Sequence, residues 1–203
     1  SPMLFSWLRN RRRKKLLATA IDPSWLPMIN RLPFFSRLSA DEQSRLVDLT
    51  RIIVAEKHWE ACGGLTLSKD MPVLIAAQAG LLILNLEHNY YKEVLSIYIY
   101  PSAYKNPQSN HHADGTVSQG TANLGEAWKR GPVVLAWDAA KYGGVNDKDG
   151  KNLVFHEFAH KLDFLNDYSQ GTPPQRSQKA YARWQRVMGA GYEKLLKDSE
   201  KGN

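Results

Sequence analysis

The chain has 203 residues, of which 43% are hydrophobic, and this indicates one soluble globular domain with a substantial core. The net charge is +7, but residues 1–15 hold six of the 27 basic residues and no acidic residue, so the remaining bases nearly balance the 20 acids. We therefore expect no direct nucleic-acid binding by the body of the protein. The single cysteine, Cys62, excludes an internal disulfide and fits a reducing cytoplasm.

Residues 1–15 are predicted to form a basic N-terminal arm in front of one domain at residues 16–203. A short cationic run such as Arg11 to Lys15 is usually solvated, and contact with a membrane surface or nucleic acid is the alternative. The apolar stretch Met3 to Leu8 precedes the basic run instead of following it, so it does not have the order of a secretory signal. These features predict a cytoplasmic protein.

Two helices are predicted in the N-terminal half. The sequence Ser39-Ala-Asp-Glu42 is a capping box that opens a helix running to about Glu56. A second helix is expected from Lys69 to Leu86. Its apolar segment, Met71 to Leu86, is interrupted by Gln78 and Asn85 and is shorter than the roughly 20 residues of a membrane span. We interpret it as a helix buried in the core.

Strands are expected in the middle of the chain. Residues 94–100 are rich in β-branched and aromatic side chains, and residues 133–137 predict a second, central strand. A polar loop at 106–120 leads into a short strand near 116–122, and a last helix is predicted at 175–197. The predicted class is α+β, mostly helical with a small mixed sheet.

The segment His156-Glu-Phe-Ala-His160 carries the clearest chemical signal. On a helix, residues four apart lie one turn apart on the same face, so both imidazoles can reach one metal ion. Glu157 lies roughly 100° around the helix from His156, where its carboxylate can act as a general base toward a water molecule at the metal. This is the zinc-hydrolase pattern H-E-x-x-H, and a buried helix does not carry such residues without partners.

A helix around this motif is favoured by its flanks. Asp147, Asp149 and Gly150 offer N-capping chemistry before an apolar run begins. Asp163 continues the histidine face, three residues after His160. It is either a third ligand or, as we favour, a neighbour that orients a histidine ring by accepting a hydrogen bond; a partner for Lys161 is the remaining alternative.

The remaining histidines and the cysteine are interpreted structurally. His111 and His112 are expected to be solvated loop residues, and His88 a hydrogen-bonded structural histidine. Cys62 is expected to be a small buried thiol and not a nucleophile or ligand.

The wider segment Phe155-His-Glu-Phe-Ala-His-Lys-Leu-Asp163 resembles the Mlc titration factor A family of bacterial cytoplasmic zinc metallopeptidases, which is related to the catalytic domain of anthrax lethal factor. The resemblance extends over most of residues 4–170. It is carried by Phe34 to Leu46, Glu56 to Gly64, Ile75 to Ala79, His88 to Tyr91, Tyr98 to Pro101, Gly125 to Trp128 and Gly131 to Trp137.

The resemblance implies a zincin-like fold with His156 and His160 as Zn²⁺ ligands and Glu157 as the catalytic base. It also implies aminopeptidase-like hydrolysis of peptides. The family's third ligand is a glutamate in a later segment of the form N-P-A-E-F-F-A, which does not occur in this chain. We therefore expect the third ligand to be a glutamate beyond Asn203, and the domain given by residues 16–203 to lack its C-terminal ligand segment.

A second function is also implied, because members of that family bind Mlc, a transcriptional repressor of sugar uptake. The chain is accordingly predicted to be a zinc metallopeptidase that acts on a peptide substrate and regulates sugar uptake by binding such a repressor. The alternative is a non-catalytic module that only sequesters the transcription factor.

Overall fold

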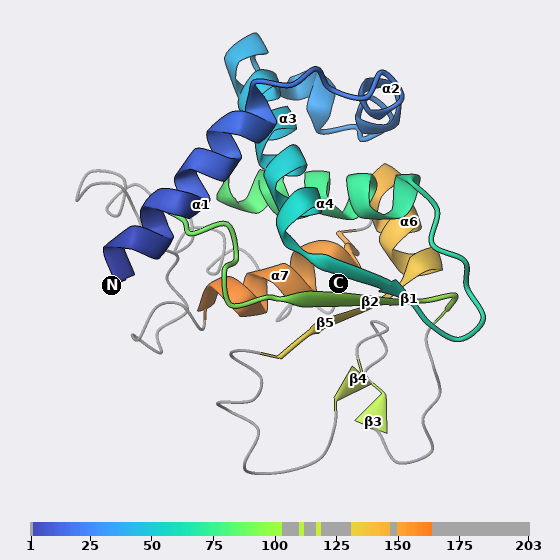
Figure 1. Cartoon of the computed structure of the whole chain (residues 1–203). Coiled ribbons are helices and arrows are strands. Elements are labelled where there is room, and N and C mark those ends of the chain that lie inside the picture. Colours follow the sequence, from blue (N-terminus) through green and yellow to red (C-terminus); the bar gives the residue numbers. More distant parts are fainter. Residues whose placement is uncertain (1, 103–109, 112–116, 119–130, 147–149, 164–203) are drawn as a thin grey trace, which may run out of the picture.

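The computed structural model describes residues 2–102, 110–111, 117–118, 131–146 and 150–163. Its elements, coloured along the chain in Figure 1, are α1 (Pro2–Leu17), α2 (Trp25–Ile29), the 3-10 helix η1 (Phe35–Arg37), α3 (Ala40–Glu56), β1 (His58–Ala61), α4 (Asp70–Ile83), β2 (Ser96–Tyr100), β3 (Asn110–His111), β4 (Val117–Ser118), β5 (Val133–Ala136), α6 (Trp137–Val145) and α7 (Leu153–Asp163). The predicted α+β class is confirmed, and the predicted last helix at 175–197 lies outside the described residues.

The sheet has the order β1-β2-β5, and both pairs of strands are parallel. The expectation of a mixed sheet is therefore wrong for these strands, and the chain passes from β1 to its parallel neighbour β2 through helix α4 and not through a hairpin. Among the described strands β2 is central and β5 lies at an edge, so residues 133–137 do not form the predicted central strand. The short pair β3 and β4, which falls partly in the predicted strand at 116–122, is antiparallel.

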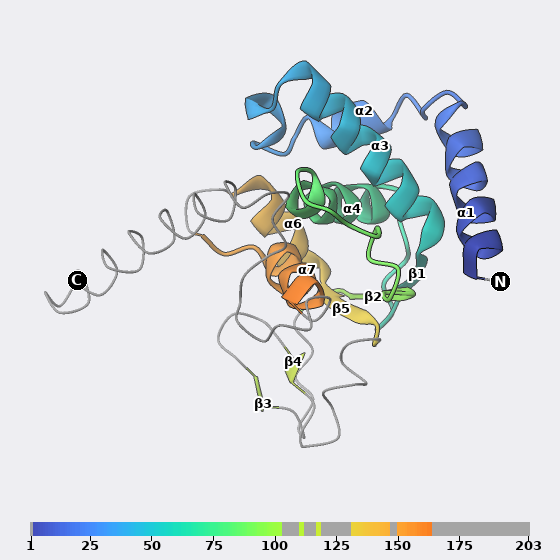
Figure 2. The same ribbon diagram turned by 90° about the vertical axis from the view of Figure 1, so that its left-hand side faces the viewer.

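The described helices gather on one side of this sheet, as the two views in Figures 1 and 2 show. The alternation of burial along β2 explains why, because Ile97 and Ile99 are completely buried whereas Tyr98 and Tyr100 are only half-buried. Val134 of β5 is likewise exposed between two buried neighbours. One apolar face of the sheet thus supports the helical layer.

Helix α4 lies at the centre of the helical layer and confirms the predicted core helix. It is buried along almost its whole length and contacts α2, α3, α6 and α7. It ends at Ile83, three residues before the predicted end. No helix in the described part of the chain combines the length and the apolar character needed to cross a lipid bilayer.

Helix α3 begins with the predicted capping box. The backbone N–H of Glu42 donates to Ser39 Oγ over 3.3 Å, and the backbone N–H of Ser39 donates to the Glu42 carboxylate over 3.0 Å. Both halves of the reciprocal cap are therefore present, and the helix extends to Glu56 as expected.

Helix α1 contains the basic run and is attached to α3 at its C-terminal half. The guanidinium of Arg13 contacts both carboxylate oxygens of Glu56 over 2.6 and 2.7 Å. Arg51 of α3 donates to the carbonyl oxygens of Leu16 and Thr19 over 2.6 and 2.8 Å, which satisfies backbone groups at the end of α1. The other five cations of residues 1–15 are exposed. The predicted domain boundary at residue 15 stays a prediction.

Candidate metal centre

Helix α7 carries the H-E-x-x-H motif and packs against α4, α6 and β5. Its inner face is formed by Leu153, Val154 and Phe158, which are buried. His156 and His160 lie on the exposed face, and Glu157 is half-buried between the two faces. The helix thus presents both imidazoles to solvent while its apolar side is fixed in the core.

The two imidazoles converge on one point. The Nε2 atoms of His156 and His160 are 3.1 Å apart, and the rings are perpendicular with their centroids 4.5 Å apart. Two nitrogens bound to one tetrahedral zinc ion at about 2.05 Å are separated by about 3.3 Å. The observed separation therefore suits two ligands of a single metal ion, and an imidazole pair of this geometry fits zinc as a borderline-soft cation.

A complete ligand set is not found among the residues that the structure describes. No group of three His, Cys, Asp or Glu side chains there is arranged to hold a metal ion. Asp163 is the last residue of α7, and its side chain lies outside the described part. The predicted roles of Asp163 and of a glutamate beyond Asn203 stay predictions.

The start of α7 is fixed by Asn152. Its Oδ1 accepts a hydrogen bond from the backbone N–H of Phe155 over 2.9 Å, and its carbonyl oxygen accepts from the N–H of His156 over 3.0 Å. The sequence prediction placed the cap earlier. Of its residues, Asp147 and Asp149 lie outside the described part, and Gly150 adopts a left-handed φ of 69° in the approach to the helix. Asn152 is therefore the observed N-cap.

Asn152 is itself held by a buried glutamine of the central helix. Its Nδ2 donates to Gln78 Oε1 and to the carbonyl oxygen of Gly143, both over 2.8 Å. Gln78 is completely buried, and its Nε2 donates to the carbonyl oxygens of Leu74 and Ala140 over 3.0 and 3.3 Å. These bonds join α4, α6 and α7 at one point, one turn before the first histidine.

This junction depends on two glycines of α6. A Cβ atom at Gly143 would lie 2.9 Å from the Asn152 Cα and from the Lys151 carbonyl oxygen. A Cβ atom at Gly144 would lie 2.9 Å from Gln78 Nε2. Since both distances are shorter than normal contacts, the glycines let the segment before α7 approach α6 closely.

Sequence reasoning did not find this junction, although one signal was visible. Gln78 interrupts an otherwise apolar helix, and a polar side chain buried in such a helix needs hydrogen-bond partners. The partners come from residues 62 and 74 positions further along the chain, so the sequence alone does not identify them.

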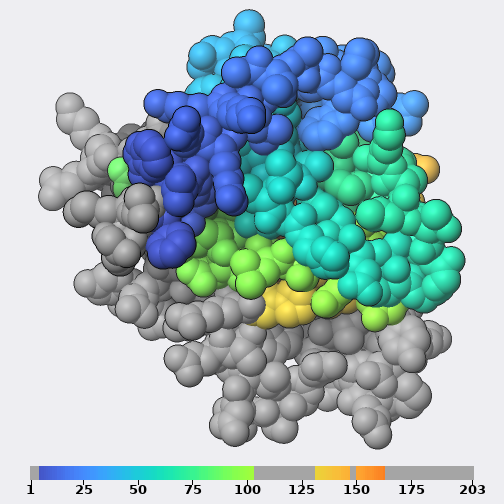
Figure 3. Space-filling model, in the orientation of Figure 1, coloured from blue at the N-terminus to red at the C-terminus, as the bar shows by residue number. Residues whose placement is uncertain are grey.

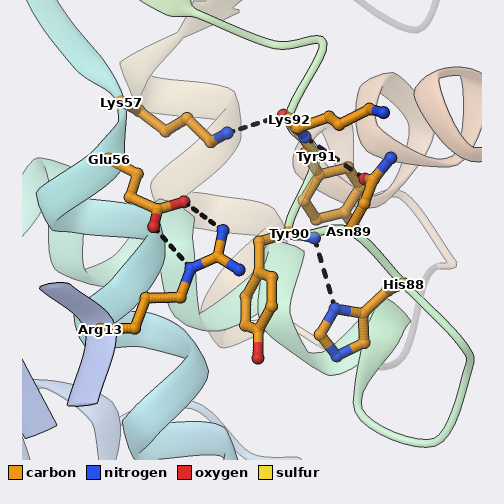
Figure 4. Close-up of polar contacts among 8 residues, drawn as sticks. All are labelled: Arg13, Glu56, Lys57, His88, Asn89, Tyr90, Tyr91 and Lys92. Carbon is orange, nitrogen blue, oxygen red and sulfur yellow. Dashed lines mark hydrogen bonds and ion pairs between the residues drawn. The ribbon is translucent and has the colours of Figure 1, made fainter. Parts of the chain in front are cut away.

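The middle of α7 is supported by the segment His88 to Lys92, shown in Figure 4. Phe158 makes an edge-on contact with Tyr91, with ring centroids 4.9 Å apart. The Tyr91 hydroxyl donates to the Ala79 carbonyl oxygen over 2.8 Å, and its burial raises the pKa of that hydroxyl. Tyr90 and Tyr91 both adopt a left-handed backbone, with φ of 58° and 51°. Bulky residues rarely adopt this conformation, so the surrounding contacts must hold it.

Lys161 extends the buried side of α7. Its Nζ donates to the carbonyl oxygen of Gly131 over 3.0 Å. Burial lowers the pKa of Lys161, and the nearby Glu157 carboxylate acts in the opposite direction. Lys161 thereby ties α7 to the residues that lead into β5.

The other candidate residues have structural surroundings. His88 Nδ1 accepts from the backbone N–H of Tyr90 over 3.3 Å, as expected of a structural histidine. Cys62 is half-buried, less than predicted, and its Sγ lies 4.0 Å from the Glu60 carbonyl oxygen. His112 lies outside the described residues, and the side chain of His111 does too.

Comparison with known proteins relates most of the chain to one family. The sequence profile described as glucose-regulated metallo-peptidase M90 matches residues 7–203. An uncharacterized protein of Synechocystis sp. is 33% identical over 193 residues, which cover 93% of this chain and 70% of that protein. The Mlc titration factor A of Yersinia enterocolitica is 30% identical over 83% of this chain, and that of Yersinia pestis is 31% identical over the same share. The matched region is 61% and 60% of those two proteins, so the chain spans less than two thirds of their length.

Proposed function

The chain belongs to the glucose-regulated metallo-peptidase M90 family, and from this premise we propose that it is a zinc-dependent peptidase whose centre lies on α7. The observation that carries the proposal is the 3.1 Å separation of the His156 and His160 Nε2 atoms on the exposed face of α7, whose opposite face is buried. We further propose a zincin-like fold, a cytoplasmic location and aminopeptidase-like action on peptides.

In this proposal His156 and His160 would hold the zinc ion together with a third ligand, a glutamate beyond Asn203. When bound, zinc supplies a Lewis acid that polarises the scissile carbonyl and makes water more acidic. Asn152 and Phe158 keep α7 in place, so that neither histidine must reorganise during turnover.

Glu157 is assigned the proton transfers. Its carboxylate removes a proton from the water molecule as the water oxygen forms a bond to the peptide carbonyl carbon. It then delivers that proton to the nitrogen as the carbon–nitrogen bond breaks, so that a free carboxylate and a free amine leave. The half-buried position of Glu157, beside the histidine face, supports this role.

The experiment that tests this assignment is Glu157→Gln in a chain extended at its C-terminus. We expect zinc content to remain near that of the parent protein, because the amide replaces a group that is not a ligand. Hydrolysis of fluorogenic aminoacyl and peptide substrates should fall by several orders of magnitude. Glu87→Gln, at an exposed carboxylate elsewhere, is the matched control and should leave turnover unchanged. Full turnover in Glu157→Gln would contradict the base assignment.

A second candidate function comes from the name of the Yersinia relatives, Mlc titration factor A. That name favours binding of a transcriptional repressor similar to Mlc, with or without hydrolysis. The same Glu157→Gln protein separates the two candidates. A non-catalytic binding module requires that neither parent nor variant hydrolyses peptides and that both bind the repressor equally in a titration. If the parent protein hydrolyses peptides and the Glu157→Gln protein does not, the chain is an enzyme.

A further inference from the structure

Helix α1 exposes large apolar side chains to solvent. Phe5, Trp7 and Leu8 are 68%, 56% and 38% exposed. All three lie within the first half of the helix. Trp7 and Leu8 lie about 100° apart around the helix axis, whereas Phe5 lies about 160° from Trp7. Figure 3 shows α1 at the surface of the molecule, with the side that faces the viewer uncovered.

The cations of α1 follow these apolar residues along the helix. Arg9, Arg11, Arg12, Lys14 and Lys15 are all exposed, and the helix contains no acidic residue. Arg13 is the exception. It is bound to Glu56, and its guanidinium carbon lies 3.8 Å from the ring centroid of Tyr90, as Figure 4 shows. Among the described residues, none of the other five cations forms an ion pair with a carboxylate.

Helical geometry places the apolar and cationic residues on one face. Residues at i, i+4 and i+7 form a stripe along a helix. Trp7, Arg11 and Lys14 form one such stripe. Leu8, Arg12 and Lys15 form the stripe beside it. Arg11 and Lys15, at the middle of this face, each lie about 160° around the axis from Arg13. The docked arginine therefore turns the two stripes away from the body.

We propose that this outer face of α1 binds the surface of an anionic lipid bilayer. Trp7 and Leu8 would enter the interfacial region, where tryptophan is favoured, while the exposed cations contact the lipid phosphates. Nucleic acid fits less well, because Leu8 cannot stack on bases and the apolar end of each stripe would face a charged backbone. This inference is independent of the proposed peptidase activity.

The test is flotation of the purified 203-residue chain with vesicles at physiological ionic strength. We expect binding to phosphatidylserine-rich vesicles and none to vesicles of phosphatidylcholine alone. Each cation at such a surface contributes about 1 kcal/mol, which is roughly a fivefold change in partitioning. The variant with Arg11→Gln, Arg12→Gln, Lys14→Gln and Lys15→Gln should therefore partition at least 100-fold more weakly, by that rough estimate.

A charge-matched control separates the role of α1 from that of net charge. It carries Arg31→Gln, Lys69→Gln, Lys92→Gln and Lys141→Gln, four exposed cations outside α1. Equal losses in the two quadruple variants would overturn the proposal, since any surface cation would then serve.

The apolar contribution has its own variant. Trp7→Ser combined with Leu8→Ser keeps every charge and should remove the vesicle binding that remains when high salt has screened the cations. Circular dichroism checks that each variant remains folded. Labelled single-stranded and duplex oligonucleotides, followed by fluorescence anisotropy, form the last arm. Tight oligonucleotide binding through the same four cations, without vesicle binding, would show that the face recognises nucleic acid and would refute the lipid assignment.

Discussion

At the scale of single residues, Lys57 is placed where its charge is unfavourable. Its side chain is buried between α3 and the segment that carries Tyr91, as Figure 4 shows, and its Nζ donates to the Tyr91 carbonyl oxygen over 2.6 Å. Burial lowers the pKa of Lys57 to about 8, although the neighbouring Glu56 carboxylate opposes the shift. The unfolded chain keeps the ordinary value of 10.5.

This difference predicts that stability rises with pH. Between about pH 8 and pH 10.5 the folded state has released the Lys57 proton while the unfolded state still holds it, so the free energy of unfolding increases through that window. Between about pH 7.5 and pH 9.5 the increase should be about 2 kcal/mol. Urea denaturation at the two pH values measures it. Lys57→Met should lose this increase relative to the parent, and Lys92→Met, at an exposed lysine, should keep it. Identical pH dependence in all three proteins would contradict the assigned pKa.

At the scale of elements, the N-terminus of α7 depends on the side chain of Asn152. Asn152→Ala removes the cap and leaves Gln78 Oε1 without its donor, so we expect a loss of about 2–3 kcal/mol in the free energy of unfolding. Asn152→Asp keeps an acceptor for the Phe155 N–H but places a carboxylate against two oxygens. It should therefore be no more stable than the alanine variant. Urea denaturation measures both variants, and Asn30→Ala, at an exposed position, is the control. Equal stability of Asn152→Ala and Asn30→Ala would show that the junction contributes nothing.

The elements that were predictable from sequence are those whose signals are local. The capping box at Ser39 and the apolar run in α4 each lie within one element, and both predictions are confirmed. Strand β1 was not predicted, because its four residues, His58 to Ala61, show little apolar character and become a strand by pairing with β2. Helix α6 was also missed. Gly143 and Gly144 are poor helix formers, and their packing against Asn152 and Gln78 is not visible locally.

The candidate site also has a part that was predictable from local sequence and a part that was not. The spacing of His156 and His160 predicts that their rings share a helix face, and the structure places their Nε2 atoms together. The supports beneath them, Tyr91 and Gln78, come from distant parts of the sequence and meet α7 only through the tertiary fold. The motif thus identifies the candidate ligands, but it does not identify the residues that support their helix.

At the scale of the whole molecule, the proposed zinc centre would need a third protein ligand besides His156 and His160. Catalytic zinc sites use three protein ligands and a water molecule. We therefore expect a chain extended at its C-terminus to bind zinc more tightly than the 203-residue chain. Residues that only hydrogen-bond to metal ligands typically change metal affinity by about 10–100-fold. The gain in zinc affinity should exceed this, since the extension adds a ligand itself. Competition with a chelator measures the two affinities. Equal affinities would place the third ligand within residues 1–203 or exclude a shared zinc ion.

The attachment of α1 also has a consequence for the molecule as a unit. Arg13 and Arg51 join this helix to α3 by several hydrogen bonds, and α3 packs on α4, which in turn contacts α7. If α1 binds a membrane, the rest of the protein could not rotate freely relative to the membrane surface, because α1 is not joined to it by a flexible linker alone. The orientation of the protein on the membrane would also fix the direction in which His156 and His160 point, and so whether a substrate reaches them from the water or from the lipid surface.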